Sequence, residues 1–177
     1  MPSPVAEAAP RRAVAPITSL DSLVGAHPGT LLDIFGAGRP TDPEELGDAP
    51  RGRLLAFAHG ADVFLAFRPL LRGLAGDLMP WRGKTFDHGG NSGQNVLVNR
   101  RVFRFQAEVG PSQVDSRPAL VLTYDAPAHG NPWPVRAIRD ELRTIGPGVA
   151  IGPAFFMAPH APVSLFWFGL ESLHGQR

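Results

Sequence analysis

The spacing of apolar residues changes along the chain near residue 53. Upstream, apolar residues form short groups typical of single helical turns. Downstream, they recur at every second position, as in strands with one buried face. Glycine- and proline-rich turns separate eight such segments, at 53–58, 84–87, 94–99, 101–109, 119–125, 135–145, 149–157 and 163–170. This pattern predicts a mostly β fold, an antiparallel meander of eight strands closed into a barrel.

The region before the strands predicts two or three short helices. Ser19 can cap one short helix, and Thr30 can cap a second over residues 31–35. Asp42 is followed by Pro43, a combination that favours a third helical turn.

Two further stretches have no strand pattern. Residues 1–16 are rich in alanine and proline and predict a disordered tail, so that 17–177 would form a single domain. Residues 63–78 have a helical spacing that Pro69 interrupts, and the pattern leaves their structure open.

The last predicted strand, 163–170, is apolar on both faces. Leu165 and Trp167 point to one side, whereas Phe166, Phe168 and Leu170 point to the other. A strand of this kind is covered on both sides. We expect barrel contents on one side and the N-terminal helices on the other.

Composition and charge narrow the function classes. The formal net charge of +1 gives no electrostatic case for nucleic acid or an anionic membrane as partner. The chain has no cysteine, which excludes disulfides, thiolate nucleophiles and cysteine-ligated metals. No signal-peptide core or membrane-length apolar stretch is found, so we expect a cytoplasmic protein. Abundant arginine, alanine, glycine and proline suggest a GC-rich bacterial source.

The hairpin around residues 135–157 carries an unusual density of charge. Alternation places Arg139, Glu141 and Arg143 on one face and Asp140 on the other. The row of three charges can be a solvated outer face, or one of the two rows can lie inside the barrel and orient a polar ligand group. Because Ile138 and Leu142 flank Asp140 on its face, we favour Asp140 inside, as a general acid; with Glu141 inside, the two arginines would flank it.

Three other groups of residues are candidates. Tyr124, the only tyrosine, is a core aromatic or a hydrogen-bonding acid, and Trp133 is a turn anchor or a ligand contact. We expect the indole of Trp81 to pack inside one end of the barrel. Lys84, the only lysine, would act as a Schiff-base or cationic group only if it is buried. The glycine-rich loop at 87–95 fits no nucleotide motif. The six histidines have no metal-binding spacing, so we expect no metal and no cofactor.

The segment Trp81-Arg82-Gly83-Lys84, followed by the period-two run, resembles small bacterial calycin-like proteins. These are lipocalin-type barrels and include a group with a G-x-W-x-G motif. The chain departs from that motif, because Arg82 lies between Trp81 and Gly83 and residue 79 is methionine. The resemblance implies a barrel with a ligand in its interior and transfers no catalytic residue.

We therefore expect a small lipophilic molecule as the partner, held in the barrel interior. The chain is then a cofactor-independent enzyme that cyclises, isomerises or dehydrates this molecule, with Asp140, Glu141 and Tyr124 as catalytic candidates. The alternative is a non-catalytic carrier or sensor. The oligomeric state stays open, a homodimer included. The expected ligand-binding residues are Arg139, Arg143, Trp133, Phe103, Phe105, Leu122, Phe155 and Trp167.

Overall fold

The computed structural model describes residues 17–58 and 81–173. The predicted tail, 1–16, and the ambiguous segment, 63–78, lie outside these residues. No helix among the described residues is long and apolar enough to cross a membrane.

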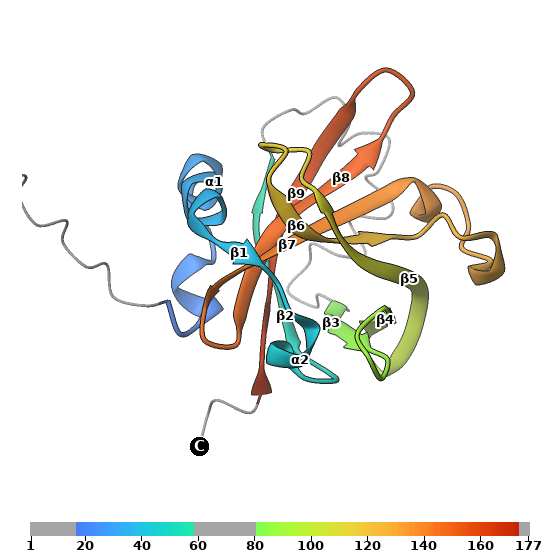
Figure 1. The fold of residues 1–177 in the computed structure, drawn as a ribbon, viewed down its shortest axis with the longest axis horizontal. Coiled ribbons are helices and arrows are strands. Elements are labelled where there is room, and N and C mark those ends of the chain that lie inside the picture. Colours follow the sequence, from blue (N-terminus) through green and yellow to red (C-terminus); the bar gives the residue numbers. More distant parts are fainter. Residues whose placement is uncertain (1–16, 59–80, 174–177) are drawn as a thin grey trace, which may run out of the picture.

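Eight antiparallel strands form a closed barrel (Figure 1). Each strand pairs with the next, and the ring closes because β2 also pairs with β9. The strands are β2 (Arg51–Phe57), β3 (Trp81–Phe86), β4 (Ser92–Leu97), β5 (Arg100–Pro111), β6 (Pro118–Thr123), β7 (Ile138–Gly146), β8 (Val149–Met157) and β9 (Pro162–Glu171). All eight predicted strands are confirmed, and their ends differ from the predicted ones by at most three residues. The two-residue strand β1 (Arg39–Pro40) pairs with the end of β7.

Three short helical elements precede the barrel from residue 17 onward, as the sequence predicts. Ser19 caps the 3-10 helix η1 (Leu20–Leu23), and Asp42 caps α2 (Pro43–Leu46). The predicted start of α1 (Pro28–Ala37) is wrong, because His27 caps this helix and Pro28 occupies its first turn. Two further 3-10 turns, η2 (Pro127–His129) and η3 (Val135–Ala137), lie between β6 and β7.

Buried apolar residues form two clusters, one inside the barrel and one between the barrel and the N-terminal helices. Strand β9 separates them, since Phe168 and Leu170 belong to the interior cluster and Trp167 to the outer one. The outer cluster includes Leu31 and Phe35 of α1, and the Phe35 and Trp167 rings meet edge to face. The expected cover of β9 on both faces is thereby confirmed.

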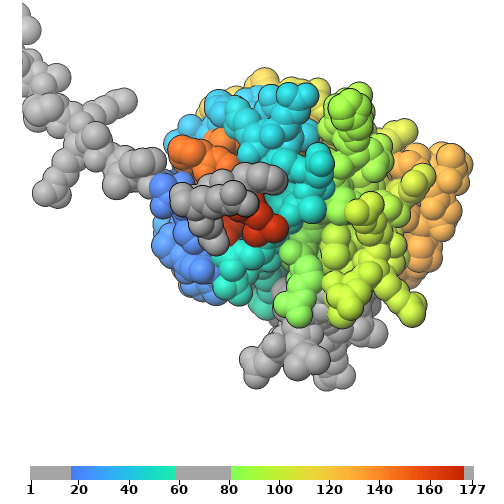
Figure 2. All heavy atoms as spheres, turned by 90° about the horizontal axis from the view of Figure 1, so that it is seen from below, coloured from blue at the N-terminus to red at the C-terminus, as the bar shows by residue number. Residues whose placement is uncertain are grey.

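One end of the barrel is closed by the α2 segment. Leu46 is buried in the interior cluster, and the amide of Phe86 donates to the carbonyl oxygen of Asp48. Seen from this end, the cyan segment that carries α2 lies beside the green β3–β4 turn and the red end of β9 (Figure 2).

Candidate functional site

Strand β7 points one charged side chain into the barrel. Asp140 lies opposite Leu122 of β6 and Ala154 of β8, and both partners belong to the interior cluster. Directly opposite residues on paired strands share a face, so Asp140 is inside. Its sequence neighbours Arg139 and Glu141 consequently point outward.

Lys84 enters the interior because strand β3 has a bulge. The pairing of β3 with β4 shifts between Trp81 and Gly83, which places Trp81 and Lys84 on the same face although they are three positions apart. Gly83 has a φ of 139°, and a side chain there would collide with the carbonyl oxygen of Pro50. Only glycine fits this close approach of β2 and β3.

Lys84, Asn95, Tyr124 and Asp140 form what we term the interior polar group. Lys84 Nζ donates to Asn95 Oδ1 at 2.9 Å, to the Tyr124 hydroxyl at 2.7 Å and to Asp140 Oδ2 at 2.8 Å. An ammonium has three hydrogens, so these contacts use all of them. The exposed fractions are 2% for Lys84, 3% for Tyr124 and 5% for Asp140. The group is thus a nearly dry ion pair with two neutral polar partners.

The direction of each hydrogen bond in the group is fixed by its neighbours. Asn95 Oδ1 accepts from both Lys84 and the Trp81 indole, which makes Nδ2 the donor to the Tyr124 hydroxyl. The Tyr124 oxygen accepts from Lys84 and Asn95, and its own hydrogen goes to Asp140 Oδ2 at 2.7 Å. Lys84 and Tyr124 both use Oδ2, and no other described residue donates a hydrogen bond to Oδ1 of Asp140.

Aromatic rings surround the Lys84 ammonium. Its nitrogen lies 5.2 Å from the ring centre of Phe105, 5.3 Å from Phe168, 5.5 Å from Tyr124 and 5.9 Å from Trp81. Ring faces attract a cation, and the attraction grows when water is excluded. The cage therefore stabilises a positive charge at Lys84.

Burial changes the acid–base properties of two members of the group. Burial lowers the pKa of Lys84, and the carboxylate of Asp140 opposes that effect. Burial also raises the pKa of Tyr124 well above its usual value, and the negative charge of Asp140 adds to the rise. Tyr124 is consequently a donor that keeps its proton at neutral pH.

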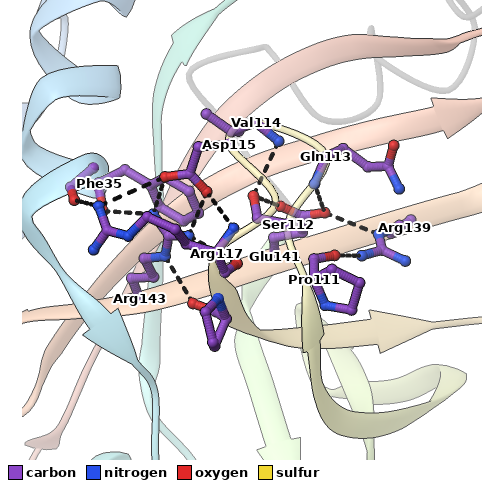
Figure 3. A network of polar contacts seen from close by, with 12 residues as sticks. Phe35, Pro111, Ser112, Gln113, Val114, Asp115, Arg117, Arg139, Glu141 and Arg143 are labelled. Carbon is purple, nitrogen blue, oxygen red and sulfur yellow. Dashed lines mark hydrogen bonds and ion pairs between the residues drawn. The ribbon is translucent and has the colours of Figure 1, made fainter.

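Two of the outward charges of β7, Glu141 and Arg143, are also buried, under the loop between β5 and β6 (Figure 3). Glu141 accepts from the Ser112 hydroxyl, from the Gln113 amide at 2.8 Å and from Arg139 Nε at 2.9 Å. It is fully buried, so the predicted solvated outer face is wrong for this residue.

Arg143 makes a second set of contacts in the same place. Its guanidinium binds Asp115 at 2.6 and 2.8 Å, donates to the carbonyl oxygen of Phe35 and stacks on the Phe35 ring. The hydrogen bond from Arg143 lowers the pKa of Asp115 to about 2, and charge attraction adds to it. We term these contacts and those of Glu141 the outer latch, because they tie the β5–β6 loop and α1 to β7.

The structure places some of the residues predicted for the site inside the barrel and others outside it. Asp140, Tyr124, Phe105 and Leu122 lie in the interior, and Phe103 packs against that cluster. Four other candidate residues lie outside the barrel interior. Glu141, Arg139 and Arg143 form the outer latch, and Trp167 packs beneath the helices.

Two further predicted contacts also lie away from the interior polar group. Phe155 lies opposite Arg139 on the outer face, because it follows the inward-facing Ala154 and neighbouring residues of a strand alternate between the two faces. Trp133 is 67% exposed on the β6–β7 connection.

Sequence reasoning gave little weight to Lys84 and missed Asn95. Simple alternation cannot place Lys84, because the bulge at Gly83 resets the count along β3. The available signal was that the only lysine lies in a strand beside Trp81 and Phe86. Asn95 lies directly opposite Lys84 on β4, a pairing that requires knowledge of the register.

Metal binding has no support among the described residues, where no three histidine or acidic side chains come together. The interior polar group instead offers one ammonium, one carboxylate, one hydroxyl and one amide. Such a set can bind an oxygen atom of a ligand and move protons to and from it.

Comparison with known proteins supports the fold alone. No protein-family model matches the chain, and no curated protein matches it. A solved crystal structure of a protein from Thermomonospora curvata is similar, with a TM-score of 0.53 and 13% sequence identity. The similarity covers 86% of this chain and 92% of that chain. The calycin-like affiliation stays a prediction.

Proposed function

We propose that the protein is a cofactor-independent enzyme that moves a proton on a small lipophilic molecule in the barrel interior. The substrate carries an oxygen function, and the reaction is an isomerisation, a dehydration or a cyclisation. The observation that carries this proposal is the buried Lys84–Asp140 ion pair, bridged by the Tyr124 hydroxyl and enclosed by aromatic rings.

A buried ion pair carries a large desolvation penalty, which apolar side chains in a barrel interior do not. Removing two charges from water costs several kcal/mol for each ion, and a well-packed apolar pair of similar volume is often at least as stable. The remaining interior is apolar and includes Phe105, Leu122 and Phe168. Packing alone therefore gives no reason for Lys84 and Asp140, whereas a proton-transfer site does.

Each member of the group has a chemical role in such a reaction. The Asp140 carboxylate accepts a proton from a carbon beside the oxygen function. For this, the Lys84 ammonium and the Tyr124 hydroxyl each turn one hydrogen from Asp140 to the substrate oxygen, where negative charge develops. Asn95 contacts both donors and holds them in place.

A carrier is the second candidate, and one observation favours it. All three ammonium hydrogens of Lys84 are already accepted by protein atoms, as suits a fixed anchor in a lipocalin-like barrel. In this case the ligand would contact Asp140 or the aromatic cage and leave unchanged.

Affinity selection from a panel of hydrophobic aldehydes, ketones, alcohols and carboxylic acids tests the proposal. The full chain is compared with a double variant, Lys84→Met with Asp140→Leu, which removes both charges together. The wild-type chain is expected to retain members of the panel that the double variant does not. Retained ketones and aldehydes are then incubated in deuterium oxide with each protein.

Exchange of hydrogen for deuterium beside the carbonyl, dependent on wild-type protein, supports the enzyme. Binding without exchange supports the carrier. Equal retention by both proteins, or no retention by either, contradicts an interior site centred on Lys84 and Asp140.

A further inference from the structure

We propose that Lys84 forms a covalent imine with the carbonyl carbon of an apolar aldehyde or ketone. The inference rests on the proposed function and narrows its substrate class. It starts from the position of the only lysine of the chain, inside an aromatic cage and in contact with a carboxylate, a hydroxyl and an amide.

The geometry suits the neutral amine that attack requires. An amine that has lost one proton keeps two N–H groups and gains a lone pair. Asn95 Oδ1 and the Tyr124 oxygen, at 2.9 and 2.7 Å from Nζ, can continue to accept hydrogen bonds from these two N–H groups. The lone pair then takes the third direction, which Asp140 occupies, so the Asp140 side chain turns aside for the carbonyl carbon to reach the nitrogen. The lowered pKa of Lys84 makes the neutral form more accessible than in water.

Asp140 can carry every proton that the reaction moves. It first accepts one from Lys84, 2.8 Å away. The amine lone pair bonds to the carbonyl carbon, the C=O π pair moves to oxygen, and this oxygen takes the proton from Asp140. The nitrogen gives a second proton to Asp140, which passes it to the hydroxyl. Water leaves as the C=N bond forms.

The net change is one ammonium and one carbonyl converted into a protonated imine and one water. No oxidant or reductant is needed. The positive imine attracts electrons from the neighbouring carbon, so Asp140 can then remove a proton there, as the proposed function requires. The same aromatic rings that surround the ammonium surround the iminium.

The substrate class follows from the cage. Phe105 and Phe168 offer ring faces, and the partly buried side chains packed against the interior cluster are also apolar: Trp81, Phe103, Ile138 and Phe166. A neutral aldehyde or ketone with an aromatic or aliphatic body fits these surfaces. A strongly hydrated substrate would lose its hydrogen bonds to water and gain none from these apolar side chains.

Reductive trapping tests the inference directly. The full chain is incubated at neutral pH with hydrocinnamaldehyde and sodium cyanoborohydride, which reduces an imine to a stable amine. Peptide mapping by mass spectrometry then locates the label. Since Lys84 is the only lysine, the α-amino group is the internal control; its pKa is roughly 7.7–8.0.

We expect Lys84 to be labelled faster than the α-amino group by roughly tenfold in the folded chain. An ordinary exposed lysine would react more slowly than the α-amino group, because it is more fully protonated at neutral pH. In urea the order should reverse. Excess hydrocinnamyl alcohol, which fits the cage and forms no imine, should protect Lys84 alone. Tyr124→Phe and Asn95→Leu, checked for folding by thermal denaturation, should slow the labelling of Lys84 and spare the α-amino group.

Binding of the alcohol in the interior, with label on the α-amino group only, would overturn the imine and leave the proposed function standing. Failure of both the aldehyde and the alcohol to bind would contradict the imine for this substrate class. The wider panel of the affinity selection then decides the proposed function separately.

Discussion

The Lys84 ammonium and the Tyr124 hydroxyl are 2.7 Å apart, and they belong to the only lysine and the only tyrosine of the chain. Their hydrogen bond points from nitrogen to oxygen, and the hydroxyl passes its own hydrogen to Asp140. Labelling of a lysine side chain and tyrosinate absorbance therefore each report on one known position. This makes the interior polar group unusually accessible to experiment.

Tyr124 should resist ionisation in the folded protein. Its pKa is raised well above the usual tyrosine value of about 10, mainly by burial. In an alkaline titration, the near-ultraviolet absorbance of tyrosinate should stay absent beyond pH about 10 and then rise together with unfolding.

The same shift makes stability depend on pH. Above pH about 10 the unfolded chain loses the tyrosine proton while the folded chain keeps it, so the unfolded state binds fewer protons. Stability is then lost as pH rises through this window. Tyr124→Phe should weaken this loss, and an ordinary titration of Tyr124 in folded protein would show that the residue is not buried against Asp140.

Removing one charge of the interior ion pair should destabilise the protein more than removing both. Lys84→Met alone leaves Asp140 unpaired in the interior, at an expected cost of about 3–5 kcal/mol. Adding Asp140→Leu should recover most of this loss. Urea denaturation of the wild-type, single and double variants measures the coupling, and additive effects would contradict a direct buried pair.

The outer latch should control acid stability. Because Arg143 lowers the pKa of Asp115 to about 2, the stabilisation from Asp115 is complete above its unfolded value of 3.8. It is lost as pH falls toward 2. Asp115→Asn should reduce the change in free energy of unfolding across this window and leave ligand binding unchanged. An unchanged acid titration of stability would contradict the role of the latch.

Two buried or partly buried tryptophans should differ in their effect on ligands. Trp81→Ala and Trp167→Ala should each cost roughly 3–5 kcal/mol, as for other large-to-small changes in a core. Only Trp81 contacts the interior polar group, through Asn95, whereas Trp167 packs against the N-terminal helices. Trp81→Phe should therefore weaken ligand capture, and Trp167→Phe should not. Unaltered denaturation midpoints in both alanine variants would refute these placements.

Local patterns were sufficient to predict the barrel. The eight strands follow from period-two alternation and from turn residues, and β9 showed its two covered faces through Trp167 and Phe168. The same alternation correctly favoured Asp140 as the inward carboxylate of β7.

The ion-pair partner of Asp140, Lys84, could not be predicted from this alternation. Lys84 is 56 positions away and reaches the interior through a bulge, which breaks the count along β3. The sequence also could not show that Glu141 and Arg143, on the outer face of β7, are buried. Their burial depends on the fold of the β5–β6 loop over β7, and loop paths leave no periodic signal.

The most direct test of the central claim compares two neighbouring carboxylates on opposite faces of β7. Asp140→Asn and Glu141→Gln each remove one negative charge with little change of shape. The dissociation constant of a ligand retained by the wild-type barrel is measured for both variants, together with their denaturation midpoints. Asp140→Asn should weaken binding at least about tenfold, or 1.4 kcal/mol, while Glu141→Gln lowers stability and keeps the affinity. Equal affinities in both variants, or a loss confined to Glu141→Gln, would contradict an interior site at Asp140.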